Sequence, residues 1–232
     1  KAGTKVIMRF AESIQPNDSL YTANLRSAYQ TNIYTLKGTG VEVWHPSFIY
    51  NGFRFVEITG YPGIPSVNDF EGMVVYDGFA TTGSLQTSDT IINKVLKNAW
   101  WGISSNYKGM PVDCPQRDER QPWLGDHAIG CYGESFLFDN AKLYAKWLND
   151  MQDAQTEEGT IPDIVPAYKK YYTDNVTWPG TYLTVTDMLY RQFGDAASVV
   201  KHYPSMRKWM KMMETKYMKN YLISRDSYGD WC

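Results

Sequence analysis

The most informative part of the chain is the acidic stretch Asp113-Cys-Pro-Gln-Arg-Asp-Glu-Arg-Gln-Pro-Trp-Leu-Gly-Asp126. It combines four carboxylates and two guanidinium groups with a tryptophan, two prolines and a glycine. Proline and glycine favour an irregular backbone, so a loop is a better interpretation than a solvated helix face. Carboxylates held close together push one another's pKa values apart, so that one can act as an acid while another stays ionised. The stretch therefore fits either a catalytic or sugar-binding loop or a structural loop of ion pairs.

The sequence on the N-terminal side of the acidic stretch predicts antiparallel β-structure. Short β-branched or aromatic runs are bounded by Gly and Pro, at Lys5–Phe10, Val41–Trp44 and Met73–Tyr76. Asn51-Gly52 lies between two more such runs, which predicts a two-residue hairpin turn. We interpret residues 1–85 as the C-terminal part of a β-sandwich domain.

From about residue 86 the apolar residues recur with a helical period. Ser88 is a candidate N-cap for a helix that begins at Asp89 and carries an apolar face from Ile91 to Ala99. Further helices are predicted over about residues 128–138 and 205–218, and two more are predicted to include Leu143–Met151 and Val185–Leu189. A methionine stripe in the last one (Met206, Met210 and Met213) is typical of core packing. Helices joined by long loops suit an α/α toroid, so the predicted fold is multidomain, β plus α.

Composition narrows the classes of function. The formal net charge of -2 gives no electrostatic attraction to nucleic acid, and no apolar run reaches the length of about 20 residues that a membrane span needs. Aromatic residues make up 15% of the chain, which suits either dense packing or stacking against sugar rings. The three cysteines show no metal-ligand spacing, and His127 has no second histidine near it. The sequence predicts no cofactor and no metal site.

The acidic stretch resembles the signature loop of bacterial α-L-rhamnosidases, glycoside hydrolase family 78. Three flanking segments agree with that family's pattern: the run from Trp44 to Gly63, Gly159–Asp163 with Trp178, and Gly229-Asp-Trp231. The resemblance implies a β-sandwich followed by an (α/α)6 toroid, with residues 86–232 forming the N-terminal part of the toroid. It also implies that the chain is a fragment of a larger enzyme, and it favours a periplasmic or secreted location.

The same resemblance implies roles for individual residues. Glu119 falls at the position of the general acid of an inverting mechanism, in which a second carboxylate activates water. Asp113, Arg117 and Asp126 fall at positions that hydrogen-bond the rhamnose hydroxyls. The pocket for the apolar face of the sugar is implied to contain Trp123, Trp178 and Trp231, and the general base to lie beyond Cys232. Asp118 and Arg120 are expected to form an ion pair that shapes the loop.

The chain departs from the family pattern at Gln121-Pro122, where Leu-Gly is more usual, and after Trp178. These departures affect the preferred substrate more than the type of reaction. Two alternatives stay open: a non-catalytic sugar-binding homologue, and an α/α-toroid glycosidase for another sugar. The expected partner is a rhamnosylated glycoside or carbohydrate, and the sequence does not determine the aglycone or the oligomeric state.

Overall fold

The computed structural model describes residues 1–229, and Trp231 of the predicted pocket lies outside this range. The chain forms two compact units. The sheet unit consists of Lys1–Tyr76 together with Cys114–Arg120. The helical unit consists of Asp77–Asp113 together with the chain from Gln121 onward. The acidic stretch is therefore divided, because its central seven residues belong to the sheet unit and its two ends to the helical unit.

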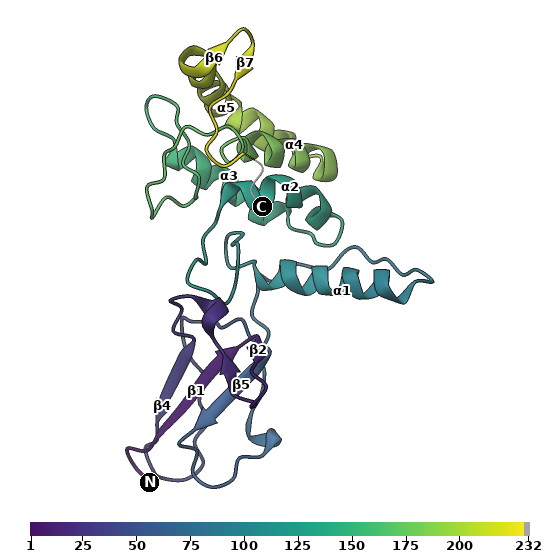
Figure 1. Ribbon diagram of the computed structural model, residues 1–232. Coiled ribbons are helices and arrows are strands. Elements are labelled where there is room, and N and C mark those ends of the chain that lie inside the picture. Colours follow the sequence, from purple (N-terminus) through teal and green to yellow (C-terminus); the bar gives the residue numbers. More distant parts are fainter. Residues whose placement is uncertain (230–232) are drawn as a thin grey trace. The chain divides into compact units, whose positions relative to one another are not determined.

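The sheet unit contains a three-stranded antiparallel sheet in the order β4-β1-β5 (Figure 1). Its strands are Lys5–Ala11 (β1), Thr31–Thr35 (β4) and Phe55–Thr59 (β5). Two-residue strands at Ser13–Ile14 (β2) and Leu20–Tyr21 (β3) pair with each other. Val6 and Phe10 of β1 are buried, as alternation along a half-buried strand requires. The predicted strand at Lys5–Phe10 is confirmed.

Three other predictions for this half were wrong. Val41–Trp44 is a loop, because the carboxylate of Glu42 accepts hydrogen bonds from the backbone N–H groups of Lys37 and Gly38, at 2.9 Å each. Met73–Tyr76 is assigned to no strand among residues 1–229. Asn51-Gly52 does not form a hairpin, since the strand before it, β4, ends at Thr35 and the strand after it, β5, begins at Phe55. At Gly52 a Cβ atom would come within 2.9 Å of Pro115 and Gln116 side-chain atoms, so this glycine serves close packing against the acidic stretch.

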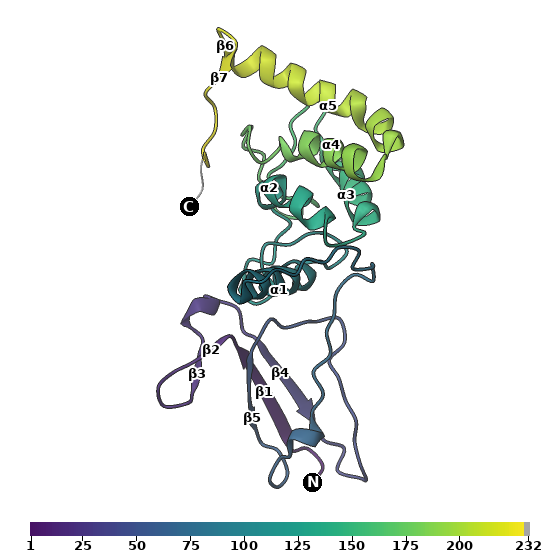
Figure 2. The ribbon, with the colours of Figure 1, turned by 90° about the vertical axis from the view of Figure 1, so that its right-hand side faces the viewer.

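As far as Gly229, the helical unit contains five α-helices. Their bounds are Thr90–Ser105 (α1), Leu124–Ser135 (α2), Ala141–Ala154 (α3), Thr181–Phe193 (α4) and Ala196–Tyr217 (α5). Helices α2 to α5 share one apolar core, which includes Trp147 of α3, Tyr182 of α4 and Trp209 of α5. A short hairpin of Met218–Lys219 (β6) and Leu222–Ile223 (β7) follows α5 directly (Figure 2). None of the helices in residues 1–229 is both long and apolar enough to cross a bilayer.

Helix boundaries differ from the sequence predictions where local polar chemistry decides. Asp89, not Ser88, caps α1, and its carboxylate accepts from the backbone N–H of Ile91 at 2.7 Å. The predicted apolar face of α1 is largely exposed in the part of the chain that the structure describes, with Ile91 at 69%. Helix α2 begins four residues before the predicted start. Helix α5 continues through Pro204 and begins at Ala196, because Asp195 caps it by accepting from Ser198 N at 2.9 Å.

The methionines of α5 occupy the core with one exception. Met206 and Met213 are buried, as predicted, and Met212 is buried beside them. Met210 is 53% exposed, and the neighbouring Trp209 occupies the buried position that was predicted for it. The helix before it, α4, is followed by the capping residue Gly194, whose φ of 69° is the left-handed conformation that commonly terminates helices.

Candidate active site

The sheet unit surrounds the proposed acid, Glu119, with guanidinium groups. Arg117 Nε donates to Glu119 Oε2 at 3.0 Å, and an Arg26 nitrogen donates to the same oxygen at 3.2 Å. The Glu119 side chain is 24% exposed. Arginine is suited to such contacts because its planar fork presents several N–H donors in fixed directions. The carboxyl group of Glu119 is therefore oriented through one of its two oxygens.

The neighbouring Asp118 is fixed by the sheet unit rather than by Arg120. Arg26 Nε donates to Asp118 Oδ1 at 2.6 Å, and Ser27 donates to Oδ2 through both its hydroxyl and its backbone N–H. These hydrogen bonds from Ser27 and Arg26 lower the pKa of Asp118 to about 2. The predicted ion pair with Arg120 was wrong, because the Arg120 guanidinium lies 4.8 Å from the centre of the Tyr50 ring. A cation over an aromatic face replaces the expected carboxylate partner.

Further hydrogen bonds tie the backbone and side chain of Gln116 to the sheet unit. Gln30 Nε2 donates to the Gln116 carbonyl, and Gln116 Nε2 donates to Glu12 Oε2 at 3.1 Å. Asn24 also donates to Glu12, at 3.3 Å. The segment from Gln116 to Glu119 thus meets polar side chains from three separate parts of the sheet unit.

In the helical unit, Asp113 and Asp126 mark the two ends of the acidic stretch. Asp113 Oδ1 accepts from the backbone N–H of Gln121 at 2.6 Å, and the backbone N–H of Asp113 donates to the Gln121 carbonyl at 3.0 Å. These two contacts close the loop at its base. Asp126 lies exposed in the first turn of α2, where the positive end of the helix dipole favours a carboxylate.

Four aromatic side chains of the helical unit form what we call the aromatic cluster: Trp123, Tyr171, Trp178 and Tyr228. The Trp123 and Tyr171 rings are stacked, with centroids 5.8 Å apart and planes 4° apart. Tyr228 contacts both indoles, with centroid distances of 6.2 Å to Trp123 and 4.5 Å to Trp178. The structure therefore brings together the two described tryptophans that the family pattern implies for the sugar pocket.

Close packing in α2 limits where Trp178 can lie. A Cβ atom at Gly125 would approach Trp178 Cε2 to 2.4 Å and Cδ2 to 2.5 Å, distances that real Cβ atoms do not show. Gly125 must therefore lack a side chain for the indole to pack over the start of α2. A glycine of the acidic stretch and a tryptophan 53 positions later in sequence thus form one packed contact.

Beside the aromatic cluster lies Asp163, which is fully buried. Thr173 Oγ1 donates to both carboxylate oxygens, at 3.0 and 2.7 Å, and the Tyr228 hydroxyl donates to Oδ2 at 3.1 Å. Burial raises the pKa of Asp163 to about 6, although the hydrogen bonds from Thr173 and Tyr228 oppose that rise. The Asp163 carbonyl accepts from the backbone N–H of Leu124, and the backbone N–H of Asp163 donates to the Tyr171 carbonyl, at 2.9 Å each.

Sequence reasoning assigned no role to Asp163, Tyr171 or Tyr228. Asp163 lay within a segment that resembled a family loop, but nothing distinguished its carboxyl from the others. Tyr171 and Tyr228 could have been suspected from the aromatic run at residues 168–178 and from the position of Tyr228 next to Gly229. The roles implied for Asp113, Arg117, Trp123, Asp126 and Trp178 stay predictions.

His127 lies beside the buried carboxyl group of Glu134, to which two tyrosine hydroxyls donate. Its Nδ1 lies 3.4 Å from Glu134 Oε1, and the hydroxyls of Tyr107 and Tyr144 donate to Glu134 Oε2. Burial opposes ionisation of Glu134, but contacts with His127 and the two tyrosines outweigh it and lower the pKa of this carboxyl. This network fixes α2, and with it the backbone of Asp126.

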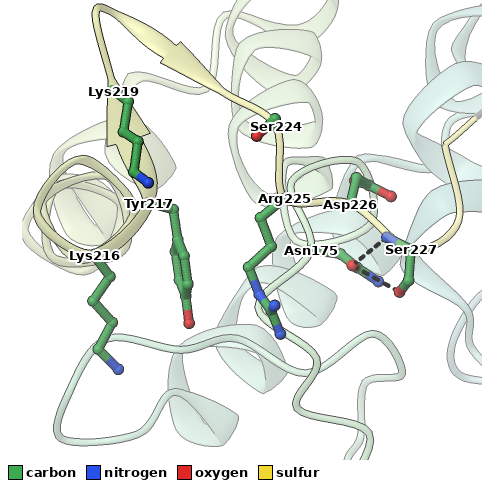
Figure 3. A pocket seen from close by; sticks show the side chains of 8 residues that line it. All are labelled: Asn175, Lys216, Tyr217, Lys219, Ser224, Arg225, Asp226 and Ser227. Carbon is green, nitrogen blue, oxygen red and sulfur yellow. Dashed lines mark hydrogen bonds between the residues drawn. The ribbon is translucent and has the colours of Figure 1, made fainter.

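The C-terminal segment is tied to the loop before Trp178. Asp226 Oδ2 accepts from the backbone N–H groups of Val176 and Thr177, at 3.0 and 2.8 Å, and Asn175 Oδ1 accepts from Ser227 (Figure 3). A cavity of about 470 Å³ lies beside this segment and is lined by Asn175, Lys216, Tyr217, Lys219, Ser224, Arg225, Asp226 and Ser227. Glu158 pairs with Lys216 at 2.7 Å, so part of the positive charge is already compensated.

Comparison with known proteins agrees with the family resemblance. The family model of the bacterial α-L-rhamnosidase 6 hairpin glycosidase domain matches residues 80–232. That of the bacterial α-L-rhamnosidase concanavalin-like domain matches residues 1–76. An α-L-rhamnosidase of Streptomyces avermitilis is 38% identical over 99% of this chain and 22% of its own length. One of Formosa agariphila is 32% identical over the whole chain and 25% of its own length.

Two solved structures are similar over the whole chain. The α-L-rhamnosidase from Dictyoglomus thermophilum gives a TM-score of 0.97 at 38% identity, with 26% of that chain covered. The Streptomyces avermitilis α-L-rhamnosidase complexed with L-rhamnose gives 0.95 at 38% identity, with 22% covered. The chain thus spans about a quarter of the length of these relatives. Since one family model covers more than half of it, the chain belongs to the bacterial α-L-rhamnosidase family, glycoside hydrolase family 78.

Proposed function

We propose that the chain acts within a glycoside hydrolase that removes terminal α-L-rhamnose from glycosides or polysaccharides by an inverting mechanism. Family membership supports the activity. The observation that carries the mechanism is the position of Glu119 in the family's acid motif, with its carboxyl group oriented by Arg26 and Arg117. In this proposal the sheet is part of a β-sandwich, the five helices are part of an (α/α)6 toroid, and the protein acts in the periplasm or outside the cell.

Glu119 donates its proton to the glycosidic oxygen while the bond from that oxygen to the anomeric carbon breaks. The bonding electrons stay with the departing oxygen, and a water molecule adds its hydroxyl to the opposite face of the sugar. A second carboxylate takes the other proton of that water. We assign this general base to no residue of the chain.

Sugar binding is proposed for the remaining residues of the family pattern. Asp113, Arg117 and Asp126 hydrogen-bond the rhamnose hydroxyls, and Trp123, Trp178 and Trp231 contact the apolar face of the sugar and its 6-methyl group. The aromatic cluster supports this assignment, because flat indole and phenol rings suit the C–H face of a sugar. The Asp163–Tyr228 hydrogen bond at 3.1 Å gives the cluster a fixed polar support.

The test is hydrolysis by the full-length protein of p-nitrophenyl α-L-rhamnoside compared with p-nitrophenyl glycosides of other sugars. We expect cleavage of the rhamnoside, and proton NMR of the first-formed sugar should show the anomer opposite to that of the substrate. Preferred cleavage of another glycoside would favour an α/α-toroid glycosidase of different specificity. Rhamnose binding without turnover would instead favour a non-catalytic sugar-binding homologue. A product that keeps the substrate's anomeric configuration would overturn the inverting mechanism alone.

A further inference from the structure

The backbone of the sheet unit is strained where it meets the acidic stretch. Arg26 has φ 56° and ψ -116°, and Gln30 has φ 35°, values that residues other than glycine rarely adopt. Such conformations cost on the order of 1–3 kcal/mol each and persist only where surrounding contacts enforce them. The side chains of both residues contact the segment from Gln116 to Glu119. The strain is therefore located where the sheet unit holds the proposed proton donor.

One guanidinium group, that of Arg26, contacts two consecutive carboxylates. Its Nε donates to Asp118 Oδ1 at 2.6 Å. Its Nη2 lies 2.5 Å from the same oxygen and 3.2 Å from Glu119 Oε2. A lysine ammonium is a single point of charge and cannot reproduce this planar arrangement of donors. Arg26 therefore links the orientation of Glu119 to an anchor, Asp118, that Ser27 holds in place.

Both guanidinium contacts of Glu119 reach the same oxygen, Oε2. A proton on Oε2 would face these N–H donors, whereas a proton on Oε1 would not. Asp118 holds the Arg26 guanidinium from its other side, so the direction in which Arg26 contacts Glu119 is fixed. The arrangement thus distinguishes the two oxygens of the acid.

We propose that Arg26 is a positioning residue for proton donation. With Asp118 it holds Oε2 of Glu119, so that the proton resides on Oε1 and leaves from there. When the proton passes to the glycosidic oxygen, Glu119 becomes a carboxylate, whose charge Arg26 and Arg117 then stabilise through Oε2. The inference deepens the proposed function, because it rests on Glu119 as the acid. Arg26 itself does not touch the substrate in this proposal.

The experiment uses the full-length enzyme with Arg26→Gln and Arg26→Lys, and with Arg9→Gln as a matched control. Arg9 also forms an arginine–carboxylate contact in the sheet unit, with Glu57 at 2.9 Å, but the contact lies in the sheet and involves no residue of the acidic stretch. We would measure kcat and KM for p-nitrophenyl α-L-rhamnoside and for methyl α-L-rhamnoside. The methoxide leaving group needs a proton, and nitrophenolate hardly needs one.

For Arg26→Gln we expect kcat on the methyl glycoside to fall about 10- to 100-fold, since a misplacement of about 1 Å can cost about 100-fold. The loss on the nitrophenyl glycoside should be much smaller, and KM should change little on either. The kcat of Arg26→Lys should lie between those of Arg26→Gln and the wild type, because an ammonium keeps the charge but lacks the planar fork of donors that fixes the direction of the contact. Arg9→Gln should retain wild-type rates on both substrates.

A double-mutant cycle separates positioning from general structural damage. In a Glu119→Gln background, Arg26→Gln should cause no further loss that is selective for the methyl glycoside, because the proton that Arg26 positions is gone. Equal losses on both substrates, or a selective loss that adds to that of Glu119→Gln, would overturn the role of Arg26. If Arg26→Gln does not fold by circular dichroism, Asp118→Asn decides instead. It should give a weaker loss with the same selectivity, and a non-selective loss would count against the proposal.

The outcomes also distinguish this inference from the function on which it rests. If Glu119→Gln loses activity equally on both substrates, Glu119 is not the acid and both ideas fail. If Glu119→Gln is selective and Arg26→Gln is not, the acid assignment stands and only the positioning role of Arg26 is lost.

Discussion

Glu119 in the sheet unit and Trp178 in the helical unit each contact a residue far away in sequence, but the contacts differ in kind. Glu119 is held by charged groups that remain partly exposed, with its own side chain at 24% and that of Arg26 at 51%. Trp178 is held by ring packing against Tyr228 and by the absence of a side chain at Gly125. Charge-assisted hydrogen bonds fix the direction of a polar group, whereas packing fixes the position of a surface.

This difference predicts that substitutions in the two regions affect different kinetic constants. Loss of a directed contact at Glu119 should lower kcat, because the interaction is needed in the transition state. Displacement of a packed surface at Trp178 should raise KM, because the same surface binds substrate and transition state alike. A substitution at the Glu119 contacts that raised only KM, or one at the Trp178 contacts that lowered only kcat, would contradict this expectation.

The largest expected effect is that of Glu119→Gln. In the full-length enzyme kcat should fall by about 10²–10⁴-fold for a sugar or alcohol leaving group, since that is the typical contribution of a positioned general acid. The loss should be smaller for p-nitrophenol. Steady-state kinetics on the two substrates measures the difference, and Asp118→Asn, which leaves the acid in place, should cost much less. A greater loss at Asp118 than at Glu119 would mean that the wrong acid has been named.

A smaller effect is expected for Gly125→Ala. The new methyl group cannot occupy the space of the Trp178 ring, so the indole has to move. Aromatic packing is worth about 0.5–1.5 kcal/mol, which corresponds to a rise of roughly 2- to 10-fold in KM for rhamnosides with kcat little changed. Gly133→Ala is the matched control, because it lies on the same helix with open space around its Cα. Equal effects of the two substitutions would exclude Trp178 as the cause.

The parts of the fold that could be predicted from the sequence are those governed by local periodicity. The apolar spacing from Leu143 to Met151 indicates a helix, and the structure buries Trp147 in the middle of α3. The same reasoning went wrong at Met73–Tyr76, which belongs to no strand of the described residues, because strand propensity depends on burial and packing that the local sequence does not determine. At Pro204 the loss of one backbone hydrogen bond was outweighed by the Asp195 cap and by burial of His202, and α5 continued.

The candidate site was predictable only where a motif supplied it. Residue type and spacing identified the acidic stretch, but the partner of Asp118 is Arg26, 92 positions earlier, and no local pattern connects them. Gly52 was interpreted as a turn residue from its local sequence. Its packing against Pro115 could not be predicted, because the two residues are distant in sequence. Asp163 was indistinguishable from other carboxyls until its burial was known.

The smallest effect on catalysis is expected for Asp163→Asn, which should act mainly on stability. Because the folded-state pKa of about 6 lies above the ordinary value of 3.8, the native protein binds more protons than the unfolded chain between these pH values. The contribution of Asp163 to stability is therefore fully present below about pH 4 and decreases as pH rises through 6. The shift corresponds to a loss of up to about 3 kcal/mol.

Asparagine carries no charge to desolvate. At pH 4 the melting temperature of Asp163→Asn should therefore be equal to or lower than that of the wild type, and by pH 7.5 it should have risen relative to the wild type. Melting temperatures of the full-length protein at intervals across this range measure the change. Asp150→Asn is the control, because that carboxylate is paired with Lys146 on the helix surface. Activity at pH 7 should fall less than about 10-fold, since asparagine keeps one acceptor for Thr173 or Tyr228 and loses one net hydrogen bond worth about 1 kcal/mol. A difference in melting temperature that stays constant with pH would show that Asp163 does not take up a proton on folding.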